Sequence, residues 1–382
     1  MTAVLPDMDT ASRLGRLRAG LDGAGVDALL VTQLPNVRYL TGFTGSAGML
    51  FVTAADALFV TDGRYRDQAS EQLGAAGVTA RVAVGATQAA QRDALSAAAA
   101  DAGIGRLGLE AEGVTWAQQR AMADSWFRGV ELLATTDVVE GLRRLKDDGE
   151  VARIEAACAI ADDTLAALLP TLADGPTERD VAIALEFGMR ERGASGNSFD
   201  PIVASGSNGA KPHARPSDRP IGRGELVVLD FGCIVDGYCS DMTRTVSVGD
   251  PGPDARHLYE VVFESQAAGS AAVAPGAVCR DVDRAARDVI EAAGWGDAFL
   301  HGTGHGVGIE IHEAPRVGST SSDTLAAGAV VTVEPGVYLT GIGGVRIEDT
   351  LVVVSSDDRA PGNGRDGAGS RVLTNSPKDL VL

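Results

Sequence analysis

Four carboxylates and one imidazole lie on or beside strand-like segments in the second half of this 382-residue chain, and they constrain its fold more than any other feature. They are Asp230, Asp241, His305, Glu334 and Glu348. Burying five such groups together costs much free energy unless a cation neutralises them. Two divalent metal ions would do so and would also lower the pKa of a shared water. The pattern therefore predicts a two-metal hydrolase site.

The segments around these residues resemble those of the metallopeptidase family that includes methionine aminopeptidase, proline aminopeptidase and prolidase. The matching segments are 226–232, 238–244, 301–306, 330–336 and 343–349, and the resemblance extends over residues 10–382. It implies an α+β protein whose C-terminal domain has the pita-bread fold, a duplicated, curved antiparallel sheet covered by helices.

The N-terminal third predicts a smaller α/β domain, residues 1–136. Leucines at helical spacing predict a helix over residues 10–24, and apolar runs predict strands at 28–32, 48–53 and 57–61 in a mixed sheet. Segments 39–43 and 62–65 resemble the non-catalytic N-terminal domain of the prolidase and creatinase branch. Methionine aminopeptidases generally lack this domain, which argues against that branch.

The remaining residues, 137–382, are predicted to form the catalytic domain, joined to the first by a connecting segment at 134–147. Helices are expected at 149–170, 254–272 and 279–293. A further helix is expected to begin after Thr177, which would be its N-cap. A hairpin is expected from 226–232 and 237–247, and a strand-rich region from 308 to 354. Asp230 and Asp241 lie on one predicted hairpin, and Glu334 and Glu348 on another, so two similar halves are expected to pool four carboxylates. The glycine-rich segment 355–370 is interpreted as a flexible inserted surface loop without a catalytic role.

The composition limits the kinds of binding partner and the cellular compartment that we expect. The net charge is −19, from 33 basic and 52 acidic residues, without the clustered Lys and Arg that nucleic-acid binding needs. We see neither a membrane-spanning apolar run nor a signal peptide. The four cysteines form no CxxC pair and are expected to be reduced and mostly buried. These features predict a cytoplasmic protein with neither a nucleic-acid nor a membrane partner.

The ligand set is rich in oxygen and has no thiolate, which favours Mn²⁺, although Co²⁺ or Zn²⁺ could also bind. The resemblance places Asp230 on one metal ion and His305 with Glu334 on the other, with Asp241 and Glu348 bridging them. It implies that a hydroxide held between the ions attacks the scissile carbonyl. Glu334 is the family's candidate to pass the water's proton to the leaving nitrogen.

Three further histidines, His213, His301 and His312, occupy places where the family contacts substrate and steadies the tetrahedral intermediate. Each could instead be an ordinary loop or core histidine; His257 is expected at the surface. Arg346 precedes Glu348 by two residues, so on a strand both would share one face, and Arg346 could brace the bridging carboxylates or histidines.

The metal ligands leave the substrate open. The N-terminal domain and the His213 loop resemble the branch that cleaves the bond before a proline, on dipeptides or on longer peptides. Arg316 lies where prolidases bind the free carboxylate of a C-terminal proline, which slightly favours an Xaa-Pro dipeptidase over an Xaa-Pro aminopeptidase. Two functions of a different class also stay open, a metal-free creatinase-like hydrolase and an inactive protein-binding relative. The resemblance also implies a homodimer.

Overall fold

The structure is a computed structural model that describes residues 4–355 and 369–382, which form two compact units. The smaller unit is Met8–Arg143, and the larger unit is Arg144–Leu382 together with the residues before Met8. The division falls seven residues after the predicted boundary at 136/137. Its position has a local cause, because Arg143 Nη1 donates to Asn36 Oδ1 at 2.7 Å and so ties the short helix α6, Glu140–Arg143, to the smaller unit. The domain boundary at 136/137 stays a prediction.

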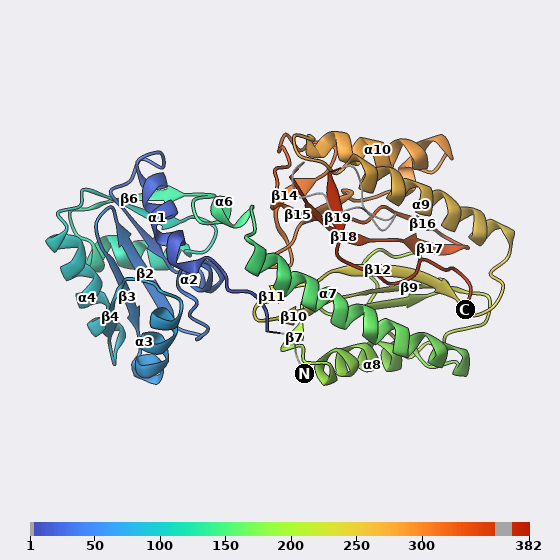
Figure 1. Ribbon diagram of the computed structural model, residues 1–382, viewed down its shortest axis with the longest axis horizontal. Helices are drawn as coiled ribbons and strands as arrows, with labels where there is room; N and C mark the ends of the chain where they lie inside the picture. Colours follow the sequence, from blue (N-terminus) through green and yellow to red (C-terminus); the bar gives the residue numbers. More distant parts are fainter. Residues whose placement is uncertain (1–3, 356–368) are drawn as a thin grey trace. The chain divides into compact units, whose positions relative to one another are not determined.

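The smaller unit is a mixed six-stranded sheet with helices packed on it (Figure 1). Its order is β4-β3-β2-β1-β5-β6; β1 pairs antiparallel with β2 and parallel with β5. The strands are β1 Ala28–Val31, β2 Gly48–Thr53, β3 Ala57–Thr61, β4 Arg81–Val84, β5 Arg106–Glu110 and β6 Glu131–Thr135. The helices are α1 Thr10–Leu21, α2 Leu34–Thr41, α3 Arg66–Ala75, α4 Gln88–Asp101, α5 Trp116–Ala121 and α6 Glu140–Arg143. The predicted mixed sheet is confirmed, whereas the expected connector at 134–147 was wrong in part, since it contains the end of β6 and all of α6.

The larger unit begins with α7 Asp148–Leu168 and α8 Glu178–Glu191. Thr177 forms the predicted N-cap, because its hydroxyl accepts from Asp180 N and the Asp180 side chain accepts in return. The stretch Asp148–Asp174 is long and apolar enough to cross a membrane by length and composition. One face of this helix, with Ile154, Cys158 and Leu165, is buried in the unit.

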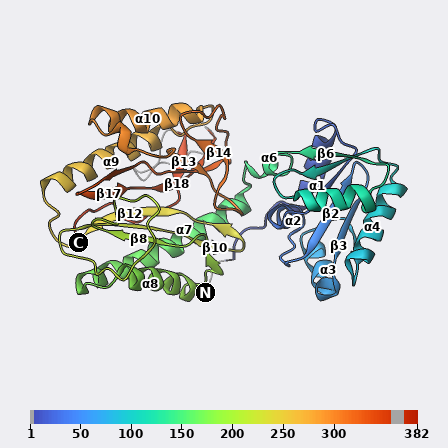
Figure 2. The same cartoon turned by 180° about the vertical axis from the view of Figure 1, so that it is seen from behind.

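Two similar halves make up the sheets of this unit (Figures 1 and 2). After α7 and α8 come β9 Leu226–Phe231, β10 Cys233–Val235, β11 Tyr238–Cys239 and β12 Met242–Ser247. After α9 Pro253–Ala272 and α10 Cys279–Ala292 come β15 Val330–Val333, β16 Gly336–Leu339, β17 Gly343–Arg346 and β18 Asp349–Val353. In the first half, β9 pairs with β12 and β10 with β11; in the second, β15 pairs with β18 and β16 with β17. All four pairs are antiparallel, so each half forms one long hairpin with a break between its two pairs. The remaining strands are β7 Gly196–Asn197, β8 Ile202–Ser205, β13 Gly304–Gly306, β14 Glu313–Val317 and β19 Ser370–Val372.

The two hairpins meet along β12 and the β17–β18 junction. Glu348 N donates to Thr243 O at 3.1 Å, and Thr350 Oγ1 donates to Asp241 O at 2.8 Å. These bonds join residues more than 100 positions apart, as the predicted pooling of two carboxylate pairs requires. Of the glycine-rich segment expected at 355–370, residues 356–368 lie outside the described residues, and Ser370 begins β19 instead of belonging to a loop.

Candidate metal centre

The five predicted ligands lie in strands or at strand ends of the larger unit. Asp230 is in β9 and His305 in β13. Asp241, Glu334 and Glu348 stand in the breaks of the two hairpins, where the ladder pairing is interrupted. Such breaks redirect a side chain from the regular alternation of a strand, which explains how carboxylates from both hairpins turn toward one place.

The structure brings the side chains of these residues together. The Nε2 atom of His305 lies 3.5 Å from Asp241 Oδ2 and 3.3 Å from Glu334 Oε1. Ligand atoms of Asp241, His305 and Glu348 all lie within 4.8 Å of one another. Asp230 joins the group through Arg346, whose Nη2 donates to Asp230 Oδ2 at 2.5 Å. The assignment of each residue to one metal ion or the other stays a prediction.

Burial, followed by the crowding of acids, dominates the electrostatics of the centre. Burial, and then the charges of Glu348, Asp230 and Glu334, hold the pKa of Asp241 well above its usual range. Burial and the neighbouring carboxylates do the same to the pKa of Glu348, and burial raises the pKa of Glu334 to about 8. Burial lowers the pKa of His305 to about 3. The fold alone thus disfavours the ionised acids, which a bound cation would stabilise.

At the centre, one buried carboxylate oxygen lacks any hydrogen-bond partner among the described residues. Glu348 Oε2 accepts from Thr243 Oγ1 at 2.7 Å, but Glu348 Oε1 is left without a donor. Such an atom is costly to bury and is the kind of group that a metal ion satisfies. With four carboxylates, one imidazole and no thiolate, the donors fit a hard divalent cation.

The ring of His305 is oriented for metal binding. Its Nδ1 lies 3.0 Å from the carbonyl oxygen of Gly306, which only accepts, so Nδ1 carries the proton. The lone pair of Nε2 then faces the carboxylates. The backbone N of His305 donates to Thr332 Oγ1 at 3.0 Å, and this hydroxyl also lies 3.4 Å from Glu334 Oε1.

Arg346 connects both halves of the site. Besides its bond to Asp230, its Nε donates to Thr243 Oγ1 at 3.1 Å and its Nη1 to Tyr338 Oη at 2.7 Å. Because Thr243 also donates to Glu348, Arg346 braces a predicted bridging carboxylate indirectly. Sequence reasoning missed Thr243, Tyr338 and Thr332. Each lies two or four residues from a predicted ligand along a strand segment, and this spacing was the one signal that could have found them.

Three of the predicted substrate residues surround the ligands, and two of these are exposed. His301 Nε2 lies 3.0 Å from Tyr338 Oη, and burial lowers the pKa of His301 to about 4. The ring of His312 packs edge-on against His305, with centroids 4.5 Å apart. Arg316 is the cross-strand partner of His305, so both side chains share one sheet face. The exposed guanidinium of Arg316 makes no hydrogen bond or ion pair with residues 4–355 or 369–382.

His213 lies in an exposed loop that reaches the same region. The neighbouring Pro212 O accepts from Arg346 Nη1 at 3.3 Å, which ties the loop to the centre. Burial is the main cause of the lowered pKa of both His301 and His312, and the neighbouring His213 contributes to it. His257 is exposed, as expected, and the four cysteines are free and buried.

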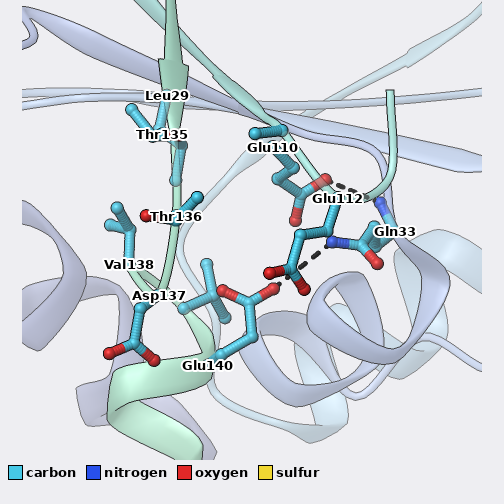
Figure 3. A pocket seen from close by; sticks show the side chains of 11 residues that line it. Leu29, Gln33, Glu110, Glu112, Thr135, Thr136, Asp137, Val138 and Glu140 are labelled. Carbon is cyan, nitrogen blue, oxygen red and sulfur yellow. Dashed lines mark hydrogen bonds between the residues drawn. The ribbon is translucent and has the colours of Figure 1, made fainter. Parts of the chain in front are cut away.

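A second group of acids lines a hollow in the smaller unit (Figure 3). Glu110, Glu112, Asp137 and Glu140 surround it, but its volume is only about 10 Å³, which is room for about one water. Glu110 is buried, yet Thr32 N, Gln33 N and two side-chain donors saturate its carboxylate. This hollow is therefore a hydrogen-bonded structural site and contains none of the predicted functional residues.

Both parts of the chain match known protein families, and the match of the larger unit is to a metallopeptidase family. Residues 152–355 match metallopeptidase family M24, and residues 13–145 match the creatinase/prolidase N-terminal domain. The structure of the Xaa-Pro dipeptidase from Bacillus anthracis is similar, with a TM-score of 0.90 and 39% identity, covering 97% of this chain and 99% of that one.

Two further relatives carry the names of the two candidate activities, dipeptidase and aminopeptidase. The Xaa-Pro dipeptidase of Pyrococcus horikoshii is 34% identical over 366 residues, which is 94% of this chain and 96% of that protein. The X-Pro aminopeptidase structure from Thermotoga maritima is 32% identical with a TM-score of 0.83, covering 94% and 99% of the two chains.

Proposed function

The chain belongs to metallopeptidase family M24, and we propose that within this family it is an Xaa-Pro dipeptidase, a metalloexopeptidase that hydrolyses the bond before a C-terminal proline. The pita-bread catalytic domain follows a creatinase-like N-terminal domain, and we place the catalytic domain at 137–382. The relatives favour this function over a metal-free creatinase-like hydrolase or an inactive binding protein.

Arg316 is the observation that carries the dipeptidase proposal. It stands opposite His305 on β14, and no acid among the described residues neutralises it. A guanidinium forks onto a carboxylate with two parallel hydrogen bonds. The free carboxylate of an Xaa-Pro dipeptide would supply this partner, because its scissile bond is one residue from the C-terminus. In a longer peptide this position holds an amide instead.

Divalent metal ions are implied by the family, and the residues present fit them. We propose two Mn²⁺ ions held by Asp230, Asp241, His305, Glu334 and Glu348. When bound, the ions would neutralise the carboxylates and supply Lewis-acid activation of water and of the scissile carbonyl.

The chain's own residues would divide the remaining tasks. The Glu334 side chain is 19% exposed, more than those of Asp230, Asp241 and His305, so its carboxylate is placed to take a proton from water and pass it to the leaving nitrogen. His301 is held neutral by burial and bonded to Tyr338, which favours a role in hydrogen bonding to substrate over proton storage. His312 and His213, on the exposed side of the centre, would contact the peptide, and Arg346 would keep Asp230 in place.

A comparison of four substrates tests the function. Protein loaded with Mn²⁺ is assayed on an Xaa-Pro dipeptide, its C-terminal amide and an Xaa-Pro-Xaa tripeptide, with a dipeptide lacking proline as the blank. We expect chelator-sensitive cleavage of the free dipeptide above the others. Preference for the tripeptide would make the protein an Xaa-Pro aminopeptidase, and absence of cleavage of every Xaa-Pro substrate would refute the proposal.

Replacement of Arg316 sharpens this test. Arg316→Ala should lower kcat/KM for the free dipeptide by about 30- to 100-fold, mainly through KM, since a charge-assisted pair is lost. The same variant should leave cleavage of the dipeptide amide nearly unchanged. Arg371→Ala, at an exposed arginine paired with Glu155, is the matched control. An equal loss on both substrates would contradict carboxylate recognition by Arg316.

We further propose that the protein is cytoplasmic and forms a homodimer. Its binding partners would be proline-containing peptides, and neither nucleic acid nor a membrane. The acidic composition and the family support this proposal. Light scattering on the purified protein checks the dimer.

A further inference from the structure

The segment that leads into the larger unit is fixed by more than its backbone. Sequence reasoning interpreted 134–147 as a connector, but Lys146 N donates to Gly328 O at 2.8 Å and Leu145 bridges Ala329. The Lys146 side chain is 1% exposed. Its Nζ lies 3.0 Å from Glu313 Oε2, in an ion pair that is buried on both sides.

Glu313 lies between the two residues that we propose contact substrate, His312 and Arg316. Its second oxygen, Oε1, accepts from Glu310 N at 3.1 Å and so closes the turn that carries His312. The carboxylate fills the space beside Gly308, where a Cβ atom would lie 2.5 Å from Glu313 Oε2. The side chain of Glu313 is therefore packed under the loop from Gly308 to Arg316, hereafter the substrate loop.

The strand pairing beside Glu313 is irregular, which makes an anchor necessary. His305 pairs with Arg316, but the next residue, Gly306, pairs with Glu313, so two residues of β14 bulge out of the ladder. A bulge loses regular backbone pairing and leaves the local position to side chains. The Lys146–Glu313 contact supplies such a constraint at the point where the ladder fails.

A buried ion pair is a poor means of gaining stability, because desolvation offsets most of the attraction. An apolar pair of similar volume would hold the segment 144–147 in place equally well. What it would lack is the directional bond that orients the Glu313 carboxylate toward both Lys146 and Glu310 N.

We propose that Lys146 is a positioning residue for the substrate loop: it orients Glu313 and thereby sets His312 and Arg316 against the metal centre. The inference rests on the proposed peptidase function and adds a residue to it from outside the metal-ligand segments. Lys146 is not a catalytic residue, because its amine contacts Glu313 and not the ligands.

Three variants and a control test the proposal: Lys146→Met, Glu313→Leu, the double variant, and Arg144→Met. Arg144 precedes Lys146 by two residues and forms a half-exposed ion pair with Asp323, so it is the matched control. Each single variant should lower kcat/KM for an Xaa-Pro dipeptide by about 10- to 100-fold at unchanged metal content. The double variant should regain the melting temperature of the wild type but keep the loss of activity. Arg144→Met should stay within twofold of the wild type.

Hydrogen exchange supplies a readout that does not depend on the substrate. Amides of residues 308–316 should exchange faster in Lys146→Met and in the double variant, with the rest of the larger unit unchanged. Activity that returns with stability in the double variant would overturn the proposal, and so would unchanged exchange of this loop. If the wild type cleaves no Xaa-Pro peptide, the proposed function fails, while the exchange data still decide whether Lys146 orders the loop.

Discussion

Two buried glutamates, Glu110 in the smaller unit and Glu348 in the larger, have opposite kinds of neighbours around their carboxyl groups. Burial raises the pKa of both. Around Glu110 the neighbours that matter next are donors, from Asn36, Thr32 and Gln33, and all of them lower its pKa. Around Glu348 the next causes are other carboxylates, Glu334 and Asp230, and both raise its pKa further.

The difference separates a structural acid from a functional one. The fold satisfies Glu110 with four hydrogen bonds, at 2.6 to 3.0 Å. The fold leaves Glu348 Oε1 without a donor among the described residues and crowds it with like charges. Evolution tolerates such an arrangement where a bound cation compensates it, so unsatisfied acids mark a metal centre better than acids as such.

The largest expected effect is that of Glu348→Gln. Loss of a carboxylate that we propose as a ligand of both metal ions should lower kcat/KM by at least about 10³-fold and reduce the bound metal, measured by elemental analysis. The same change should stabilise the metal-free protein by about 1–3 kcal/mol at pH 7, because the amide is neutral where the carboxyl must either ionise among other acids or bind a proton. Glu155→Gln, at an exposed glutamate, is the control. Full metal content together with activity within tenfold of the wild type would show that Glu348 is no ligand.

A pH dependence of the metal-free protein follows from Glu334. Its pKa is about 8 in the folded state against about 4.5 in the unfolded state, so the folded state binds the extra proton between these values. The contribution of Glu334 to stability is therefore fully present below pH 4.5 and is lost as pH rises through 8. Calorimetry should find the melting temperature of the larger unit falling from pH 5 to pH 8. Mn²⁺ should reverse this fall, and Glu334→Gln should make it shallower, with the remainder due to Asp241 and Glu348. An equally steep fall in this variant contradicts the assignment to Glu334.

Much of the fold was predictable because local signals and packing agree. The expected helices at 254–272 and 279–293 match α9 and α10 within one residue at each end, and Pro253 at the start of α9 fits the first helical turn. The convergence of the five proposed ligands was predictable because each lies in a distinctive segment.

Arg346 was predicted beside the ligands, but the residues that it contacts there, Thr243 and Tyr338, were not predictable, and neither was Lys146 behind the substrate loop. Thr243, Tyr338 and Lys146 are ordinary residue types, and what makes them important is the partner that strand register brings to them. Thr243 meets Glu348 across 105 positions, and Lys146 meets Glu313 across 167. Without the register between distant strands, a hydroxyl or an amine in the sequence carries no sign of its partner. The connector was misjudged for the same reason, since its buried lysine is paired far away in the chain.

The smallest expected effect is that of Glu110→Gln, which completes the comparison from the structural side. A glutamine amide would place its NH₂ group against Thr32 N and Gln33 N, or against Asn36 Nδ2, all of which are donors. At least one of these buried donors would lose its acceptor, so the smaller unit should be destabilised by about 1–3 kcal/mol at pH 7. Calorimetry would resolve this loss, with Glu112→Gln, an exposed acid beside the same hollow, as the control. Metal content and kcat/KM should match the wild type, because a saturated carboxylate has no part in binding a cation. A loss of bound metal in Glu110→Gln would instead make the hollow of Figure 3 a second cation site and remove the distinction between the two glutamates.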